Sequence, residues 1–336
     1  QKNGYSPSYG IESLRVAISN FEKNQKNGGW NCNPSDVYIT SGVSEALLIL
    51  FASFLFPNDK ILTPGPFYPP YVSYPPIFKS SVIQYRLMEE DNWKIDFDDI
   101  KKKLDNNVKL LCVINPNNPT GSVLEKDEIL KLIEIVDEYT NCTIISDEIY
   151  NKFNFDDNHI SIASLSKKTP VITLNGISKG YFAPGWRIGY IAIHDPEDKL
   201  EYVRDGIEKL LRGRLSAPTP AQHGFLAALI QKEDWRVNYN KKLIKQRNYC
   251  VERINDIDGI SVRKPKGAFY IFPKIEYNRY NSDKEFVLKF LEKEKVLLVH
   301  GSGFSKEYGK NHIRIVYLPD IEILEIAFDR LKSFMK

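Results

Sequence analysis

A lysine and an arginine flank one irregular loop in the middle of the sequence. Ser178-Lys179-Gly180 follows the apolar run 171–174, and Pro184-Gly185-Trp186-Arg187 comes shortly after it. A lysine at the end of a buried strand is costly to desolvate as a cation, so its pKa falls and its amine becomes nucleophilic. The planar guanidinium of Arg187 suits a phosphate dianion. Taken alone, a lysine and an arginine are more often solvated surface charges.

An amine for an aldehyde and a guanidinium for a phosphate together point to pyridoxal 5′-phosphate (PLP). Asp147 ends the apolar run 143–146, where a carboxylate could keep a pyridinium nitrogen protonated. Thr40-Ser41-Gly42-Val43-Ser44 leads from a strand into a helix, whose free N–H groups can hold an anion. Asn115 to Gly121 follows another strand and offers an amide donor. As purely structural features, these segments would be a strand-end cap, a helix cap and an Asx/Pro turn.

The elements around these segments predict that they meet in space. Short apolar strands alternate with amphipathic helices from about residue 37 to 195, which is typical of an α/β fold with a mainly parallel sheet flanked by helices. Strands are expected at 37–40, 81–87, 108–114, 143–146, 171–174 and 189–193, and helices at 44–55 and 125–139. Because the carboxyl ends of parallel strands share one edge, Gly42, Asn118, Asp147 and Lys179 should lie together there.

The C-terminal third has a different pattern. Residues 196–256 are mostly helical, with interruptions at Pro218 and Pro220, and 261–275 is strand-like. A helix at 283–295, strands at 296–299 and 313–317 and a last helix complete an α+β unit. We therefore expect a large α/β domain at 1–234 and a smaller α+β domain at 235–336, which includes the linking helix.

Composition favours small-molecule chemistry. The 336 residues carry a net charge of +3 without a basic block, so neither nucleic acid nor an anionic membrane surface is an expected partner. No apolar stretch approaches the roughly 18 residues of a membrane span. The four cysteines show no C-x-x-C spacing, so no metal site is expected and a reducing cytoplasm is indicated. Because the sequence begins at Gln1 without a methionine, we expect an N-terminal piece to be missing.

Several motifs carry a resemblance to a known family. Asn115 to Gly121, Ser146 to Tyr150, Ser178-Lys179 with Arg187, and His312-Ile313-Arg314-Ile315 resemble segments of the fold type I, class I/II aminotransferases, with a likeness that runs from about Tyr5 to Leu331. Segments 214–217, 220–223, 266–274 and 295–299 are similar to the alanine aminotransferase branch. Pro184 to Arg187 with Ile193-His194-Asp195 is similar to tyrosine aminotransferases.

The resemblance implies a role for each matching residue. Lys179 would form the Schiff base with PLP and carry the proton between the substrate Cα and the cofactor. Arg314, with Asn118, would bind the substrate carboxylate. The remaining roles are a salt bridge to the pyridine nitrogen (Asp147), hydrogen bonds to the ring oxygen (Asn118, Tyr150), stacking on the ring (Tyr68) and phosphate binding (Gly42, Val43, Ser44, Ser178, Arg187). Tyr5 would reach the phosphate of the partner subunit in a homodimer with shared active sites.

The implied reaction is transamination of an amino acid with a 2-oxo acid. The expected pair is L-alanine with 2-oxoglutarate, giving pyruvate and L-glutamate, with tyrosine or aspartate as the alternative donor. Two departures from the family pattern are Gly176, where many relatives have serine or threonine, and the absence of the N-terminal glycine-bearing segment that usually closes over the substrate.

The same motifs allow two alternative functions to be considered. Gly176-Ile177-Ser178-Lys179-Gly180 matches G-x-S-x-G, the nucleophile elbow of serine hydrolases, with Ser178 as nucleophile. An elbow needs a continuous helix after the serine, and Pro184-Gly185 forbids one. A PLP-fold protein without catalysis is disfavoured because Lys179, Asp147 and Arg314 are all present.

Overall fold

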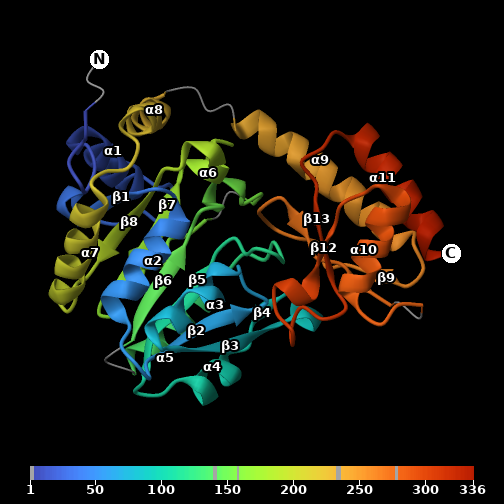
Figure 1. Ribbon diagram of the computed structural model, residues 1–336, viewed down its shortest axis with the longest axis horizontal. Helices are drawn as coiled ribbons and strands as arrows, with labels where there is room; N and C mark the ends of the chain where they lie inside the picture. Colours follow the sequence, from blue (N-terminus) through green and yellow to red (C-terminus); the bar gives the residue numbers. More distant parts are fainter. Residues whose placement is uncertain (1–3, 139–141, 157–158, 232–235, 277–278) are drawn as a thin grey trace.

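An eight-stranded sheet forms the centre of the larger part of the molecule (Figure 1). The computed structural model describes residues 4–138, 142–156, 159–231, 236–276 and 279–336. The strand order across the sheet is β1-β8-β7-β6-β5-β2-β3-β4. The strands are β1 (Val37–Thr40), β2 (Lys60–Gly65), β3 (Ser81–Met88), β4 (Lys94–Ile95), β5 (Val108–Ile114), β6 (Thr143–Asp147), β7 (Val171–Gly176) and β8 (Gly189–His194).

Strand direction brings the predicted site segments to one edge of this sheet. Parallel pairings join β3, β2, β5, β6 and β7, whereas β8 runs antiparallel to both of its neighbours, β7 and β1. β1 therefore points the same way as the parallel strands. The residues that follow β1, β5, β6 and β7 leave the sheet at the same edge, and so do the residues that precede β8. The prediction of a mainly parallel α/β sheet is confirmed.

Helices cover both faces of the sheet because its strands are apolar on both sides. In β5, Leu110, Cys112 and Ile114 pack on one face and Leu111 and Val113 on the other. The first face is covered by α2 (Val43–Phe54), α3 (Pro70–Ser73) and α7 (Glu201–Arg214). The second face is covered by α1 (Glu12–Lys23), α4 (Phe97–Lys103), α5 (Lys126–Asp137) and α8 (Thr219–Ile230).

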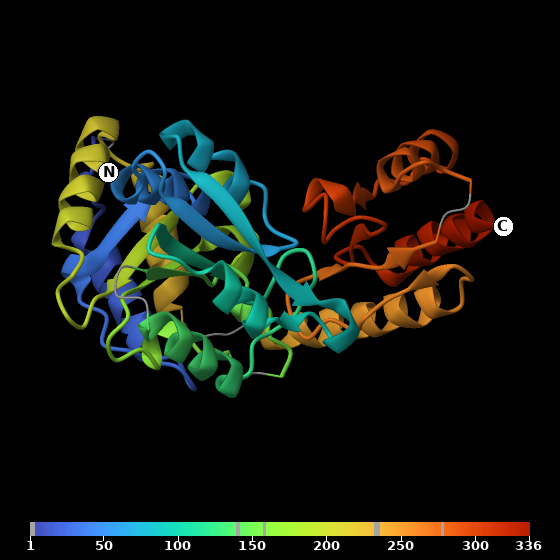
Figure 2. The ribbon, with the colours of Figure 1, turned by 90° about the horizontal axis from the view of Figure 1, so that it is seen from below.

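The chain beyond residue 236 builds a smaller α+β unit with its own core, which lies to one side of the large sheet (Figure 2). β10, β13 and β12 form an antiparallel sheet, and β11 pairs with β9. Ile149 and Tyr150, which follow β6, join the core of this unit. The elements are α9 (Arg236–Asn255), β9 (Ile260–Ser261), β10 (Tyr270–Ile271), β11 (Lys274–Ile275), α10 (Asp283–Glu294), β12 (Val299–His300), β13 (Ile313–Val316) and α11 (Ile321–Met335).

Some boundaries differ from the predictions. β2 is not among the predicted strands; it contains Pro64, which lies beyond the part of β2 that pairs with β5, which ends at Leu62. Pro220 lies in the first turn of α8 rather than interrupting a helix, since proline needs no N–H there. The strand predicted at 296–299 is β12, which begins only at Val299.

Two further predictions concern the whole chain. The predicted domain boundary at 234/235 and the predicted helix end at Tyr139 lie outside the described residues, and the two-domain division stays a prediction. Within the described ranges, no helix has both the length and the apolar character needed to cross a membrane.

Candidate active site

One cavity of about 240 Å³ lies at the edge where the strands end. Every predicted site residue lines it except Gly42, which immediately precedes Val43, and Tyr5, which is 82% exposed. Four lining residues were not predicted: Ile114, Ile149, Pro184 and Tyr270. The full lining is Val43, Ser44, Tyr68, Ile114, Asn118, Asp147, Ile149, Tyr150, Ser178, Lys179, Pro184, Arg187, Tyr270 and Arg314.

Lys179 is placed by α6 (Ile177–Gly180), a single turn that follows β7. Burial lowers the pKa of its ammonium group below the ordinary lysine value, and the positive charges of Arg314 and Arg187 lower it further, against the opposing effect of Asp147. Lysine is readily shifted in this way because a compact ammonium loses much hydration on burial. A larger fraction of Lys179 is therefore the neutral, nucleophilic amine.

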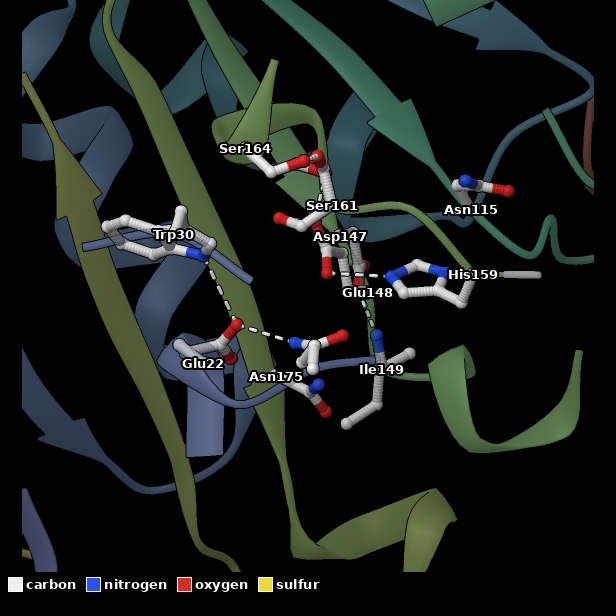
Figure 3. Close-up of polar contacts among 12 residues, drawn as sticks. Glu22, Trp30, Asn115, Asp147, Glu148, Ile149, His159, Ser161, Ser164 and Asn175 are labelled. Carbon is white, nitrogen blue, oxygen red and sulfur yellow. Dashed lines mark hydrogen bonds and ion pairs between the residues drawn. The ribbon is translucent and has the colours of Figure 1, made fainter. Parts of the chain in front are cut away.

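Asp147 is the last residue of β6 and is only 2% exposed (Figure 3). One carboxylate oxygen accepts the backbone N–H of Ile149 at 3.2 Å, and the other accepts the Tyr71 hydroxyl at 3.1 Å. Burial raises the pKa of Asp147 to about 7, although both hydrogen bonds act to lower it. In the described part of the chain, no lysine or arginine forms an ion pair with this carboxylate, so its ionised form lacks a cationic partner at contact distance.

Behind Asp147, the next carboxylate turns away from the cavity. Glu148 is fully buried and contacts Nε2 of His159 at 2.8 Å through Oε2 (Figure 3). Its Oε1 accepts the hydroxyls of Ser146 at 2.9 Å and Ser161 at 2.7 Å. Sequence reasoning missed this network, whose only signal was the adjacent Asp-Glu pair. By holding Glu148, it fixes the strand end that presents Asp147.

An anion cradle forms where α2 begins. Gly42 has a φ of 85°, and a Cβ at this position would come within 2.5 Å of Arg187 Nη2, so only glycine fits. Arg187 donates from Nη1 to the carbonyl of Pro184 and from Nη2 to that of Ser41, each at 3.0 Å. These bonds fix the guanidinium beside the N–H groups of Val43 and Ser44, which open the helix. A helix N-terminus beside a fixed guanidinium suits a phosphate.

Arg187 reaches this edge because β8 runs antiparallel. Arg187 stands two residues before β8, and the start of β8 lies beside the end of β7, where Gly176 pairs with Gly189. Ser178 and Lys179 follow β7 directly. The short loop between β7 and β8 thus places Ser178, Lys179 and Arg187 on the same cavity, as predicted.

The opposite wall of the cavity comes from the C-terminal unit. Arg314 lies in β13 and donates from Nη1 to Oδ1 of Asn118 at 3.0 Å. Within the described residues, Arg314 forms no ion pair with an aspartate or glutamate. Its positive charge is therefore available to an acidic group that enters the cavity.

Two tyrosines complete the lining from the large sheet. Tyr68 lies between the end of β2 and α3, and Tyr150 lies just beyond β6. The Tyr150 hydroxyl is 2.9 Å from that of Tyr270. Burial raises the pKa of Tyr150 well above the ordinary tyrosine value, so this hydroxyl keeps its proton and can donate a hydrogen bond.

The serine-hydrolase alternative fails on this geometry. α6 ends at Gly180, so no extended helix follows Ser178. Among the described residues that line the cavity, none is a histidine that could act as a base. A larger cavity of about 680 Å³ lies between α1, α8 and α9, and none of the predicted site residues lines it.

Comparison with known proteins decides the family. Residues 1–331 match the model of the aminotransferase class I and II family. The chain belongs to this family. It is thus an aminotransferase, an enzyme of transamination whose substrates are an amino acid and a 2-oxo acid, and the family is PLP-dependent.

Three proteins illustrate what the aminotransferase is similar to. It is 37% identical over 337 residues to the glutamate-pyruvate aminotransferase AlaA of Escherichia coli, covering 99% of this chain and 82% of that protein. It is 34% identical to a probable aspartate aminotransferase of Methanocaldococcus jannaschii, covering 100% and 86%. The solved structure of an alanine aminotransferase from Pyrococcus furiosus superposes with a TM-score of 0.96 at 48% identity, covering 99% and 84%. The predicted fold type I architecture of the aminotransferase is confirmed.

Proposed function

We propose that this aminotransferase binds PLP in the cavity at the sheet edge and transfers the amino group of L-alanine to 2-oxoglutarate. One observation carries the proposal: Lys179, Asp147, Arg187 and Arg314, from three separate segments, line a single cavity. An amine, a buried acid and two guanidinium groups are what a phosphorylated aldehyde and an amino acid need in one place.

The residues present fit PLP on two counts. Asp147 is a buried carboxylate whose pKa is raised to about 7, and a cationic ring nitrogen against it would favour its ionised form. Arg187 lies against Gly42 at the start of α2, where a phosphate would meet both the guanidinium and the N–H donors of the helix. Asp147 and the first residues of α2 line the same cavity, as a ring with a phosphate arm requires.

When bound, PLP supplies an aldehyde for the amino group and a ring that accepts the electron pair released at the substrate Cα. Lys179 Nζ is the base that takes the Cα proton and returns it, and its lowered pKa suits it to that task. Asp147 holds a proton on the ring nitrogen. Asn118 and Tyr150 donate hydrogen bonds to the ring oxygen, and Tyr68 covers one face of the ring.

The phosphate is held by Arg187, Ser178 and the first residues of α2, Val43 and Ser44, with Gly42 giving the close approach. Arg314 binds the α-carboxylate of the amino acid through two parallel N–H donors, and Asn118 keeps its guanidinium in place. These two anion sites line the same cavity as Lys179, and together they would orient the substrate Cα toward the amine.

Alanine as the donor rests on two supports. The similar proteins of E. coli and P. furiosus are named as glutamate-pyruvate and alanine aminotransferases. Segments 214–217, 220–223, 266–274 and 295–299 also resemble the alanine aminotransferase branch. The relative named as a probable aspartate aminotransferase keeps aspartate as the alternative.

A panel of amino donors with 2-oxoglutarate tests this preference. We expect kcat/KM for alanine to exceed that for aspartate and tyrosine by about tenfold or more, a difference of roughly 1.4 kcal/mol in transition-state binding. The reverse order, with aspartate or tyrosine tenfold better, would contradict the alanine assignment and leave transamination standing.

We also infer a reducing, cytoplasmic setting. Cys32, Cys112, Cys142 and Cys250 are all buried and unpaired by disulfides. Buried free thiols behave as small apolar side chains, which suits a compartment that keeps thiols reduced.

A further inference from the structure

The guanidinium of Arg314 lies between two aromatic rings. Its Cζ is 4.5 Å from the ring centroid of Tyr270 and 4.7 Å from that of Phe304. Tyr270 lies in β10 opposite Val316 of β13, so Arg314, two residues before Val316, is its diagonal neighbour on the same face. Strand register therefore determines that one ring covers the guanidinium.

This environment holds the cation without neutralising it. Among the described residues, Nε of Arg314 is buried and has no hydrogen-bond partner. The side chain of Arg314 as a whole forms a hydrogen bond to one other side chain there, the neutral amide of Asn118. Ring faces attract a guanidinium, and the attraction is stronger when the group is desolvated. A flanking carboxylate would instead compete with the substrate for the same charge. The two rings thus orient Arg314 and leave its charge for the incoming carboxylate.

The hydroxyl of Tyr270 has a second partner. It lies 2.9 Å from the Tyr150 hydroxyl, and the two rings meet edge to face at 5.6 Å. Burial raises the pKa of both tyrosines, so each hydroxyl carries one proton. If Tyr150 donates its proton into the cavity, Tyr270 must donate to the Tyr150 oxygen. A donor that itself accepts a hydrogen bond is a stronger donor.

We propose that Tyr270 is a positioning residue that serves both halves of the site, with its ring orienting Arg314 for the substrate carboxylate and its hydroxyl strengthening the hydrogen bond that Tyr150 donates to the cofactor ring oxygen. The inference rests on the proposed function, because it takes PLP as the occupant. It assigns separate effects to the ring and to the hydroxyl of one side chain.

Three variants separate these effects. Tyr270→Phe removes the hydroxyl and keeps the ring, Tyr270→Leu removes both, and Phe304→Leu removes only the opposite ring. Two readouts need no turnover: the pH titration of the visible absorbance of the PLP-loaded protein, and the Kd of propionate, which carries the carboxylate of alanine without its amino group. Steady-state KM and kcat for alanine complete the set.

For Tyr270→Phe we expect the pKa of the visible absorbance to rise by about half a unit or more, because Tyr150 becomes a weaker donor to the ring oxygen. Propionate affinity should stay within about twofold of wild type. For Phe304→Leu we expect the opposite pattern: the absorbance titration is unchanged, and the Kd of propionate and the KM of alanine rise by about fivefold or more. Tyr270→Leu should show both changes.

The result that overturns the inference is a Tyr270→Phe protein whose absorbance titrates as wild type, or ring variants that bind propionate within twofold of wild type. Because Tyr270→Phe is nearly isosteric, its outcome does not depend on whether Tyr270→Leu folds. Failure of the proposed function looks different. Wild-type protein would then bind no PLP or leave alanine unchanged. If this inference alone fails, wild type is active, and the variants do not show separate effects on the absorbance titration and on the Kd of propionate.

Discussion

At the scale of single residues, the site depends on charges that burial leaves without full compensation. Asp147 loses its water, receives two hydrogen bonds and has a pKa raised to about 7. Lys179 loses its water as well and has a lowered pKa. Both shifts have the same cause, desolvation of the charged form, and both prepare the groups for a partner that enters the cavity.

We predict that Asp147→Asn retains PLP but lowers kcat for alanine by about a hundredfold or more, because an amide cannot hold the proton on the ring nitrogen. Tyr71→Phe is the matched control, since it removes one hydrogen bond to Asp147 and keeps the carboxylate. The control should lose less than about tenfold. Steady-state kinetics on PLP-saturated protein measure both. A near-normal rate for Asp147→Asn would show that Asp147 is only a strand-end cap.

At the scale of elements, strand order determines which residues can meet. β1, β5 and β6 end at one edge, and the loop from β7 to the antiparallel β8 lies there too, so four short segments deliver most of the cavity lining. The close packing of two of these segments requires a glycine: Gly42, at φ 85°, lies against the Arg187 side chain.

Gly42→Ala should therefore weaken PLP binding. The added Cβ would lie 2.5 Å from Arg187 Nη2 and would strain a backbone angle that favours glycine. We expect the Kd for PLP, measured by absorbance titration, to rise by about tenfold or more. Gly185→Ala, in the loop that carries Arg187, is the control, because a Cβ at Gly185 meets no atom within 4 Å. Equal affinities for the two variants would argue against a phosphate cradle at Gly42.

Helix α1 places another buried carboxyl group, that of Glu22, against the sheet. Glu22 is fully buried, and its Oε2 accepts N–H groups from Gln25 at 2.7 Å and Trp30 at 3.3 Å, while its Oε1 contacts the Tyr190 hydroxyl (Figure 3 shows Glu22 and Trp30). Burial, followed by the charge of Glu148, raises the pKa of Glu22 to about 7. All three hydrogen bonds act to lower this pKa, and burial outweighs them.

The raised pKa of Glu22 predicts a pH dependence of stability. The folded pKa of about 7 exceeds an unfolded value of about 4.3, so the folded state holds a proton that the unfolded state has released. The free energy of unfolding should fall as pH rises from about 4.3 to 7, by on the order of 3–4 kcal/mol from this group, and level off above that range.

Glu22→Gln should remove this dependence, because the amide stays neutral at every pH and its carbonyl oxygen can still accept the N–H groups of Gln25 and Trp30. We expect urea denaturation at pH 8 to show the variant more stable than wild type by about 1–3 kcal/mol, with a smaller difference at pH 5. Glu12→Gln, an exposed position of the same helix, should leave the pH profile unchanged. Parallel profiles for wild type and Glu22→Gln would contradict a protonated Glu22.

At the scale of the whole molecule, the sequence predicts site residues whose position follows from neighbouring residues. It does not predict contacts between residues that are far apart in the chain. Lys179 and Asp147 could be found because each ends an apolar run that becomes a buried strand. Glu22 and Glu148 are 126 positions apart, and Tyr150 and Tyr270 are 120 apart, so only the fold brings these pairs together. Arg187 was predicted from its place shortly after Lys179 and from the affinity of a guanidinium for phosphate, while its place at the carboxyl ends of the strands follows from the antiparallel β8.

Association of two chains is the remaining proposal at this scale. Tyr5 is 82% exposed and does not line the cavity of its own chain, and we propose that it serves the phosphate of a partner subunit. Tyr5→Ala and Lys179→Ala chains, each weak or inactive alone, should regain activity when mixed, because a heterodimer contains one site with both residues intact. Lys179→Ala mixed with Asp147→Asn is the control that should not recover, since these residues belong to one cavity. No recovery in verified Tyr5/Lys179 heterodimers would place Tyr5 outside the partner's site.

The central claim, that Lys179 is the amine that joins PLP, can be tested directly by borohydride reduction of the PLP-loaded protein followed by peptide mapping. We predict a yellow protein and a single stable adduct on Lys179, the lysine whose pKa is lowered within the cavity. Lys179→Arg, which keeps the charge without a reactive primary amine, should yield no adduct. An adduct on any other lysine, or none on wild type saturated with PLP, would contradict the account.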